Sequence, residues 1–170
     1  VPDENFATMA SEGVLASLDR FIASDKLDTS DFYQSLLSGD RYRGAQYALP
    51  YEANPQLMIY NQSLLEKYDL PSKFSKPTPD EFEAISTQLS KVKGKKLYGT
   101  TNDFNWYNAA AAYQDEPFNV SDHRINLTSS RFSKAIKLMQ QLYANAGNMN
   151  VTSDLFDEGK VAFEPIYLAQ

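Results

Sequence analysis

The sequence predicts an α/β fold, in which helices alternate with short strands along most of the chain. Apolar residues recur at spacings of three and four from residue 129 to about Gly147, as on the buried face of an amphipathic helix. A second helix is predicted by Thr78-Pro79-Asp80-Glu81, which combines a capping hydroxyl, a proline in the first turn and a glutamate three residues after the cap. Short apolar runs bounded by turn formers, at residues 56–61 and 161–163, predict strands.

The first third of the chain predicts short helices and a hairpin. Residues 3–12 place three apolar side chains on one helical face and are followed by a glycine that favours a helix end. Residues 31–37 indicate another helix, closed by Gly39. A glycine between two short segments in residues 42–49 predicts a β-hairpin, and residues 51–55 predict a loop.

The rest of the chain predicts strands and helices in alternation. Turn formers separate most of these segments, and Asn61 is placed to cap the helix that follows it. The predicted elements are a buried strand over 56–61, a helix over 63–67, a helix from Thr78 that buries Phe82, Ile85 and Leu89, a strand over 97–99, a helix over 105–113 that packs closely through four alanines, an irregular hairpin over 118–127, a helix from 129, and a segment over 155–160 that leads into a strand over 161–163.

Composition limits the function classes. The 170 residues are 42% hydrophobic and 13% aromatic, enough to build a core. The net charge is −6, from 16 basic and 22 acidic residues, which argues against nucleic acid or an anionic membrane as the main partner and favours a neutral ligand. The chain has no cysteine, so disulfides, thiolate metal sites and cysteine nucleophiles are excluded. No stretch approaches the roughly 18 apolar residues that span a bilayer.

Four short motifs occur in an order that is typical of one family. They are residues 6–15 with Leu18-Asp19, residues 47–51 leading into 57–61, Thr78-Pro79-Asp80-Glu81-Phe82, and residues 156–163 (FDEGKVAF). In this order they resemble the extracellular solute-binding proteins of ABC importers, specifically the sugar-binding group similar to maltose-binding protein. Pro79 stands where the family usually has tryptophan, and a first helical turn accepts proline there.

The resemblance implies a periplasmic-binding-protein-like fold and an incomplete chain. Residues 1–52 would form part of lobe 1, residues 53–56 a hinge crossing and residues 57–170 most of lobe 2, with further chain before Val1 and after Gln170. The implied function is noncovalent capture of a small solute, expected to be a sugar or oligosaccharide, for the membrane subunits of an ABC importer. The implied location is extracellular or periplasmic, with any membrane attachment through a lipid anchor upstream. No cofactor, metal or catalytic residue is implied.

The resemblance also gives candidate ligand-binding residues. Sugar rings present apolar C–H faces that stack on aromatic rings, and their hydroxyls need polar partners once water is expelled. By similarity the cleft positions are Asp3, Glu4, Asn5, Glu52, Asn54, Asp103, Asn105, Trp106 and Tyr167.

Structural roles compete with these assignments. Asp3 and Asn5 are also suited to capping the first helix, and Glu52 to a solvated loop. Trp106, the single tryptophan, is also a candidate core residue. Proteins similar to maltose-binding protein have an acidic and a basic residue at the position of Glu4-Asn5, whereas this chain has no arginine nearby. This departure argues against maltodextrin as the ligand.

Two other function classes stay open on the sequence. A glycosidase needs two carboxylates, and Glu52 with Asp103 is one such pair, although nothing in the sequence fixes their separation. An extracellular interaction domain would use the 11 tyrosines at a protein interface. The single histidine, His123, lies in a polar loop, where a solvated side chain is expected, and one imidazole supplies neither a triad nor a usual zinc site.

Overall fold

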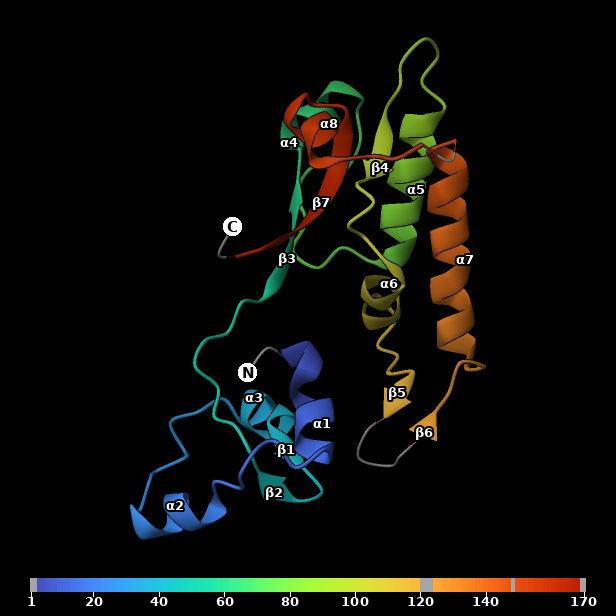
Figure 1. The fold of residues 1–170 in the computed structure, drawn as a ribbon. Helices are drawn as coiled ribbons and strands as arrows, with labels where there is room; N and C mark the ends of the chain where they lie inside the picture. Colours follow the sequence, from blue (N-terminus) through green and yellow to red (C-terminus); the bar gives the residue numbers. More distant parts are fainter. Residues whose placement is uncertain (1–2, 120–123, 148, 169–170) are drawn as a thin grey trace. The chain divides into compact units, whose positions relative to one another are not determined.

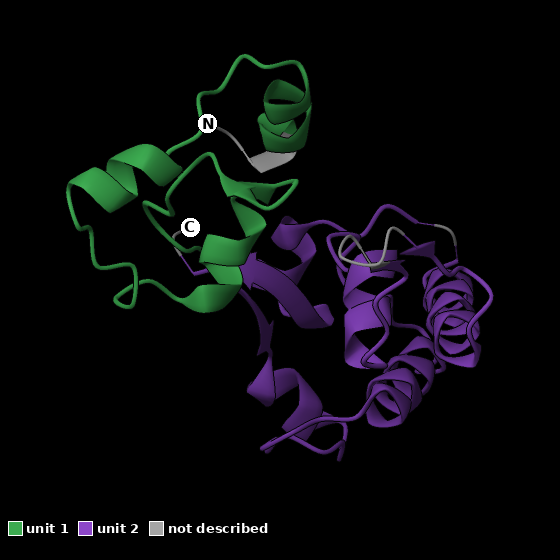
Figure 2. Ribbon diagram, turned by 90° about the horizontal axis from the view of Figure 1, so that it is seen from below, with its two compact units in different colours: residues 1–55 green, residues 56–170 purple. Residues whose placement is uncertain are grey.

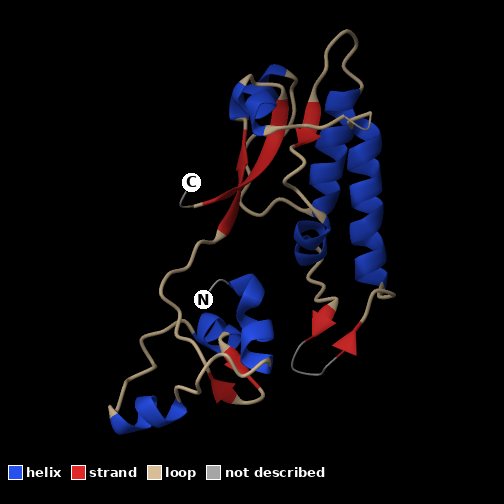
Figure 3. Cartoon of the chain, in the orientation of Figure 1, coloured by secondary structure: helices blue, strands red, loops and turns tan. Residues whose placement is uncertain are grey.

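The computed structural model describes residues 3–119, 124–147 and 149–168, without the side chains of Asp3, Glu4 and Asn119. His123 therefore lies outside the described residues. The chain divides into two compact units, residues 1–55 (unit 1) and residues 56–170 (unit 2), which Figure 2 colours separately. Helices and strands occur in both units (Figure 3), so the predicted mixed α/β character is confirmed. The assignment of residues to lobes and a hinge stays a prediction.

Over its described residues, 3–55, unit 1 has three short helices and one hairpin. Its elements are α1 (Asp3–Ser11), α2 (Asp19–Ser24), α3 (Gln34–Gly39), β1 (Arg41–Tyr42) and β2 (Ala45–Gln46). The predicted helix over 3–12 corresponds to α1, which buries Phe6 and Ala10. The helix predicted over 31–37 begins three residues later than expected, because residues 31–33 form a turn that leads into it.

The hairpin of unit 1 is shorter than predicted and turns on two residues. Arg41 pairs with Gln46 and Tyr42 with Ala45, which leaves Arg43 and Gly44 as the two-residue loop. Their φ angles are 49° and 84°. Positive φ at both positions is the geometry that matches the twist of an antiparallel pair, and glycine adopts it without the strain that Arg43 carries.

Unit 2 is built on a three-stranded sheet with strand order β3-β7-β4 (Figure 1). The central strand β7 (Val161–Tyr167) is antiparallel to β3 (Gln56–Tyr60) and parallel to β4 (Tyr98–Thr100). The remaining elements of unit 2 are α4 (Gln62–Lys67), α5 (Pro79–Ser90), α6 (Trp106–Ala112), the hairpin strands β5 (Phe118–Asn119) and β6 (Arg124–Ile125), α7 (Ser130–Asn145) and α8 (Ser153–Asp157).

Side-chain caps fix where the helices of unit 2 begin. Asn61 accepts a hydrogen bond from the backbone N–H of Leu64 at 2.9 Å, as its position before α4 predicts. Thr78 and Glu81 form the predicted capping box at the start of α5, in which the Thr78 N–H donates to Oε2 of Glu81 at 2.8 Å. Ser129 caps α7 through the N–H of Phe132.

The core of unit 2 lies where α5 and α7 pack beside the sheet (Figure 1). Ile85 and Leu89 of α5, Leu138 of α7 and Phe163 of β7 are all at most 2% exposed. The ring of Phe82 packs on that of Phe163, with centroids 4.8 Å apart. The alanines of α6 let it approach α7 closely, since Ala109 and Ala110 are fully buried, which confirms the role predicted for them.

Two of the predicted strands differ from the structure, one in its burial and one in its length. The strand over 56–61 was predicted to be buried, but β3 has an exposed first half, because it lies at the edge of the sheet and pairs only with β7. The strand predicted over 161–163 continues to Tyr167, because pairing with β3 supports it over its whole length. The segment 155–160, expected to lead into this strand, consists of residues 155–157 of α8 and the turn that follows the helix.

A candidate ligand site at the carboxyl end of the sheet

Several segments of unit 2 meet at one edge of its sheet. Because β4 and β7 are parallel, their carboxyl ends lie at the same edge, and the antiparallel strand β3 begins there. The segment 101–105 leaves β4 at this edge and leads directly into α6 (Figure 1). Two of the predicted site residues, Asp103 and Asn105, lie on this connection. Trp106 is the first residue of α6, and Tyr167 is the last residue of β7.

A polar hollow of about 390 Å³ lies beside Asp103. It is lined by Asn102, Asp103, Asn150, Val151, Thr152, Ser153 and Asp154. The hollow thus combines two carboxylates, two amides and two hydroxyls with a single apolar residue. Groups of these kinds donate to and accept from sugar hydroxyls, and the carboxylates form the stronger, charge-assisted bonds.

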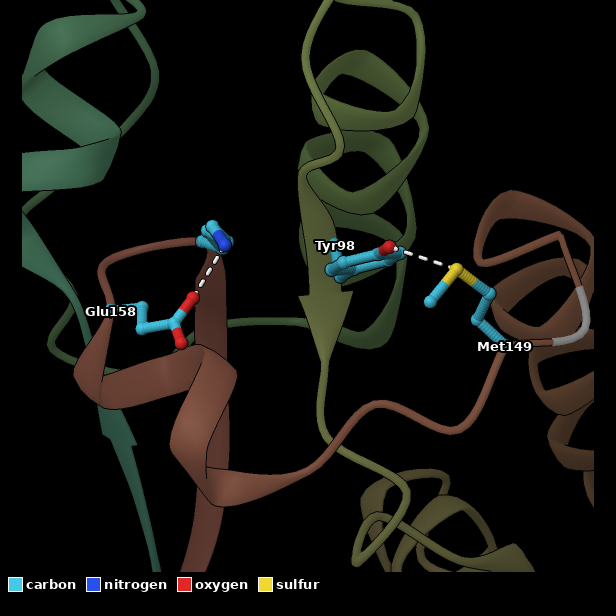
Figure 4. Close-up of polar contacts among 4 residues, drawn as sticks. Tyr98, Met149 and Glu158 are labelled. Carbon is cyan, nitrogen blue, oxygen red and sulfur yellow. Dashed lines mark hydrogen bonds and ion pairs between the residues drawn. The ribbon is translucent and has the colours of Figure 1, made fainter.

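The two walls of the hollow are tied together by hydrogen bonds. The Asn102 N–H donates to the carbonyl of Val151 at 2.8 Å, and the Asn102 side chain donates to Oδ1 of Asn150 at 2.7 Å. One residue earlier, Met149 accepts a hydrogen bond through its sulfur from the hydroxyl of Tyr98, at 3.2 Å (Figure 4). The buried Tyr98 thereby anchors the chain just before it enters the hollow.

The helix α8, whose first two residues line the hollow, leads at its far end into β7. Glu158 directly follows α8 and forms an ion pair with Lys160, drawn in Figure 4. The carbonyl of Lys160 accepts from the N–H of Tyr98, the first residue of β4. The strand that leads to Asp103 and the helix that carries Asp154 are therefore linked at the opposite end from the hollow.

Asn105 has a structural role at the start of α6. Its Oδ1 accepts from the N–H groups of Tyr107 at 2.9 Å and Asn108 at 3.3 Å, and its own N–H donates to Oδ1 of Asn108 at 2.9 Å. This reciprocal arrangement is a capping box with asparagine at both positions. The amide oxygen of Asn105 is therefore engaged by the helix.

Trp106 presents a partly exposed ring within an aromatic group. Its side chain is 41% exposed and lies outside the buried core of unit 2. Phe118 of β5 and Phe132 of α7 contact it edge to face, with ring centroids 5.9 and 6.2 Å from that of Trp106. Edge contacts leave part of the indole accessible, as a stacking surface for a sugar requires.

Tyr167 and α6 are connected through Gln56. Tyr167 pairs with Gln56 in the register of β7 and β3, and its side chain is 46% exposed. Oε1 of Gln56 accepts a hydrogen bond from the side-chain amide of Asn108, in the first turn of α6. The end of β7, the start of β3 and the start of α6 are thus joined at the edge where the candidate residues lie.

The other predicted site residues belong to unit 1. Asn5 lies inside α1 with an exposed side chain, so it does not occupy the capping position that precedes the helix. Asp3 and Glu4 also belong to α1, but their side chains are outside the described set. Glu52 and Asn54 are exposed in the segment between β2 and β3. Their participation in one site with the residues of unit 2 stays a prediction.

The second wall of the hollow was not predicted from the sequence. Asn150, Thr152, Ser153 and Asp154 form a run of polar residues that leads from the end of α7 into the first turn of α8, broken only by the buried Val151. That polar run was visible in the sequence, but its position beside Asp103 depends on contacts across 48 residues.

The arrangement is suited to hydrogen bonding and stacking. Among the described residues, no cluster of three or more histidine, aspartate or glutamate side chains is arranged to hold a metal ion. In the same part of the chain, no helix has both the length and the apolar character that crossing a membrane requires.

A family model described as bacterial extracellular solute-binding protein matches residues 1–169. Among solved structures, the ABC substrate-binding protein Lmo0181 from Listeria monocytogenes, in complex with cycloalternan, is similar with 24% identity and a TM-score of 0.72. The match covers 96% of this chain and 45% of the Listeria protein.

Two further structures are similar over comparable lengths. UgpB from Mycobacterium tuberculosis, in complex with glycerophosphocholine, has 22% identity and a TM-score of 0.72, covering 95% of this chain and 42% of that protein. The sugar-binding protein MalE from Xanthomonas citri has 20% identity and a TM-score of 0.74, covering 97% of this chain and 44% of that protein. The chain therefore spans less than half the length of these relatives.

Proposed function

Because this chain belongs to the family of bacterial extracellular solute-binding proteins, we propose that the protein it is part of captures a small hydroxyl-rich solute, a sugar or oligosaccharide, for an ABC importer. Capture is noncovalent, and the membrane subunits of the importer receive the solute. The protein acts outside the cytoplasmic membrane, at the cell surface through an upstream lipid anchor or in the periplasm.

The polar hollow beside Asp103 is the observation that best supports this function. It brings two carboxylates, two amides and two hydroxyls around one space, with a partly exposed tryptophan three residues beyond Asp103. Hydroxyl groups of a sugar would bond to the carboxylates and amides, while a C–H face of its ring would stack on the indole. In this proposal Asp103, Trp106 and Tyr167 contact the solute directly.

The solute is closed between two lobes in this proposal. Residues 1–52 form part of lobe 1, residues 53–56 cross between the lobes and residues 57–170 form most of lobe 2. The division of the chain into compact units at Pro55 and Gln56 supports a crossing in this region. Asp3, Glu4, Asn5, Glu52 and Asn54 would supply the contacts from lobe 1.

The charge of the hollow favours a sugar over a phosphate-containing solute. UgpB was crystallised with glycerophosphocholine, so structures similar to this chain are not limited to sugar complexes. Asp103 and Asp154 both line the hollow, and two carboxylates repel a phosphodiester while they accept from neutral hydroxyls. The net charge of −6 acts in the same direction.

We propose that the protein has no glycosidase activity. The family consists of binding proteins. The carboxylates considered for catalysis are Glu52 and Asp103, and carboxylates in a sugar site serve as hydrogen-bond acceptors without any reaction.

Calorimetric titration of the intact protein tests the proposal. A panel of neutral mono- and oligosaccharides should include one that binds saturably and is recovered unchanged by chromatography, whereas glycerophosphocholine should bind much more weakly. Asp103→Asn should weaken the sugar at least about tenfold, because a charge-assisted hydrogen bond is replaced by a neutral one.

A matched variant separates a specific contact from a general loss of charge. Asp157→Asn removes an exposed carboxylate of α8 that does not line the hollow, and it should leave the affinity unchanged. Equal affinities for the wild type and Asp103→Asn would remove Asp103 from the site. Absence of binding across the whole panel, or conversion of a sugar to product, would contradict the proposed function itself.

A further inference from the structure

Two adjacent threonine hydroxyls at the carboxyl end of β4 are buried without a hydrogen-bond partner in the protein. They are Oγ1 of Thr100, the last residue of β4, and Oγ1 of Thr101, whose side chain is 1% exposed. The backbone of Thr101 is fully bonded, since its N–H donates to Phe163 and its carbonyl accepts from Phe104. For Thr101 the unsatisfied group is therefore the hydroxyl and not the backbone.

Both threonines line a small cavity between the end of β4 and α7. The cavity has a volume of about 20 Å³. Asn102 and Phe104 line it from the connection to α6, and Met139 and Leu142 from α7. A space of about 10–15 Å³ is sufficient for one water molecule when polar partners are present, so this cavity has room for one and not for a larger ligand.

An empty cavity would make these threonines unfavourable. A buried hydroxyl without a partner loses its bonds to bulk water and gains nothing in return, which costs more than a normal hydrogen bond contributes. Valine has nearly the same shape as threonine and would fill either position without that loss. The two hydroxyls therefore indicate a polar occupant.

We propose that this cavity binds one ordered water molecule, which the hydroxyls of Thr100 and Thr101 hold between β4 and α7. The water satisfies both hydroxyls and fills the space under the connection from β4 to α6. Asn102 and Phe104, which flank Asp103, line the same cavity, so the water also stiffens the segment that carries Asp103. The inference does not depend on the identity of the solute.

The proposal is tested by whether replacing either threonine with valine lowers or raises the Tm. Thr101→Val and Thr100→Val should each lower the Tm of the intact protein by at least about 2 °C, because each leaves the water short of a partner. If the cavity were dry, the same changes would remove an unsatisfied hydroxyl, and the Tm would rise. A rise in both variants would overturn the proposal.

Two controls and a direct observation accompany the thermal measurement. Thr101→Ser keeps the hydroxyl and should retain the water, whereas Thr8→Val replaces an exposed hydroxyl of α1 and should change the Tm by less than either buried substitution. A crystal structure at about 1.5 Å should show a peak within hydrogen-bonding distance of both hydroxyls, where hydrogen bonds of this kind measure about 2.5–3.0 Å. A cavity without such a peak would refute the inference, whatever the Tm values.

Discussion

The side-chain amide of Asn108 donates a hydrogen bond to Oε1 of Gln56, 52 residues earlier in the chain. The same side chain accepts from the N–H of Asn105 at 2.9 Å, so it both caps α6 and attaches that helix to the start of β3. Gln56 is in turn the register partner of Tyr167. One amide thus connects the helix that begins with Trp106 to the strand pair that ends at Tyr167.

Replacing Asn108 by alanine should destabilise unit 2. Asn108→Ala removes the capping acceptor and the donor to Gln56 together, and we expect a loss of about 1–2 kcal/mol in the free energy of unfolding. Urea unfolding followed by circular dichroism measures this loss.

A second variant separates the two roles of Asn108. Gln56→Ala removes the acceptor of the bridge and leaves the cap formed by Asn108 in place. In a double-mutant cycle of Asn108→Ala with Gln56→Ala, the bridge should appear as a coupling of about 0.5 kcal/mol or more. Additive effects of the two changes would show that the bridge contributes nothing to stability.

The close approach of α5 to β4 should make Gly99 intolerant of substitution. A Cβ added at Gly99 would lie 2.3 Å from both Cβ and Oγ of Ser86, and 2.9 Å from its Cα. Both residues are buried, so neither segment can yield without disturbing the core. Gly99→Ala should therefore cost about 1–3 kcal/mol or more by overpacking, measured by chemical unfolding.

Gly39 offers the matched control for this prediction. It lies at the end of α3 with no atom within 4 Å of an added Cβ, and its φ is not positive. Gly39→Ala should be neutral or slightly stabilising, since alanine has less conformational freedom to lose on folding. Replacing Ser86 by glycine as well should restore only part of the stability of Gly99→Ala, because the Cα of Ser86 still lies too close.

Local patterns predicted most helix starts but little of the packing. The caps at Asn61, Thr78 and Asn105 each depend on contacts within three residues, so the sequence contains all the information they need. The exposure of β3 depends on sheet order, which places it at an edge. An apolar run such as residues 56–61 is compatible with a central or an edge strand.

The candidate site shows the same limit. Asp103 was predicted from the resemblance, as were Asn105 and Trp106, which lie close to it in the sequence. Asp154 was not predicted, because its position beside Asp103 depends on the bonds between Asn102 and the segment 150–151. Contacts between distant segments of this kind have no local pattern.

Unit 1 depends on one buried amide, that of Gln46. The Gln46 side chain is 2% exposed. Its Nε2 donates to the backbone carbonyls of Leu37 at 3.0 Å, Ala48 at 2.7 Å and Asp40 at 3.3 Å. Gln46→Ala should cost about 2–3 kcal/mol, because several carbonyls would lose their donor at once. Unfolding of the chain, monitored by a probe in residues 1–55, measures this cost.

Gln46→Glu should be worse than alanine at neutral pH and should depend on pH. Because Arg41 Nε donates to Oε1 of Gln46 at 3.0 Å, the test is made in an Arg41→Ala background, which removes that cation. The new carboxylate would then face carbonyl oxygens, so burial and repulsion would raise the pKa of the introduced side chain in the folded state. A raised folded-state pKa means that stability is highest below the unfolded-state pKa and falls as pH rises through the folded-state pKa. A variant whose stability does not change between pH 4 and 7 would show that the side chain has left the carbonyls.

Acid should weaken the start of α5 through Glu81. The N–H of Thr78, and then its hydroxyl, hold the pKa of the Glu81 carboxyl below its ordinary value of 4.5. Because the folded-state pKa is lowered, the stabilisation is fully present above the ordinary value and is lost as pH falls through the lowered pKa. Glu81→Gln can still form a capping box but cannot titrate, so its Tm should lie below that of the wild type at pH 7 and converge with it near pH 2–3.

Thr78→Ala refines this test, because it removes the smaller cause of the lowered pKa and leaves the larger one. The backbone N–H of residue 78 still donates to Glu81, so the acid-dependent fall in Tm should shrink without disappearing.

Asp28 in unit 1 also has a lowered pKa, through the N–H of Ser30, and its carboxylate likewise loses stabilisation as the pH falls. The comparison should therefore be made in an Asp28→Asn background. In that background, the Tm of the Glu81→Gln protein is compared with the Tm of the protein that keeps Glu81. If the difference between the two Tm values stays constant from pH 7 to 3, the carboxylate does not stabilise the helix.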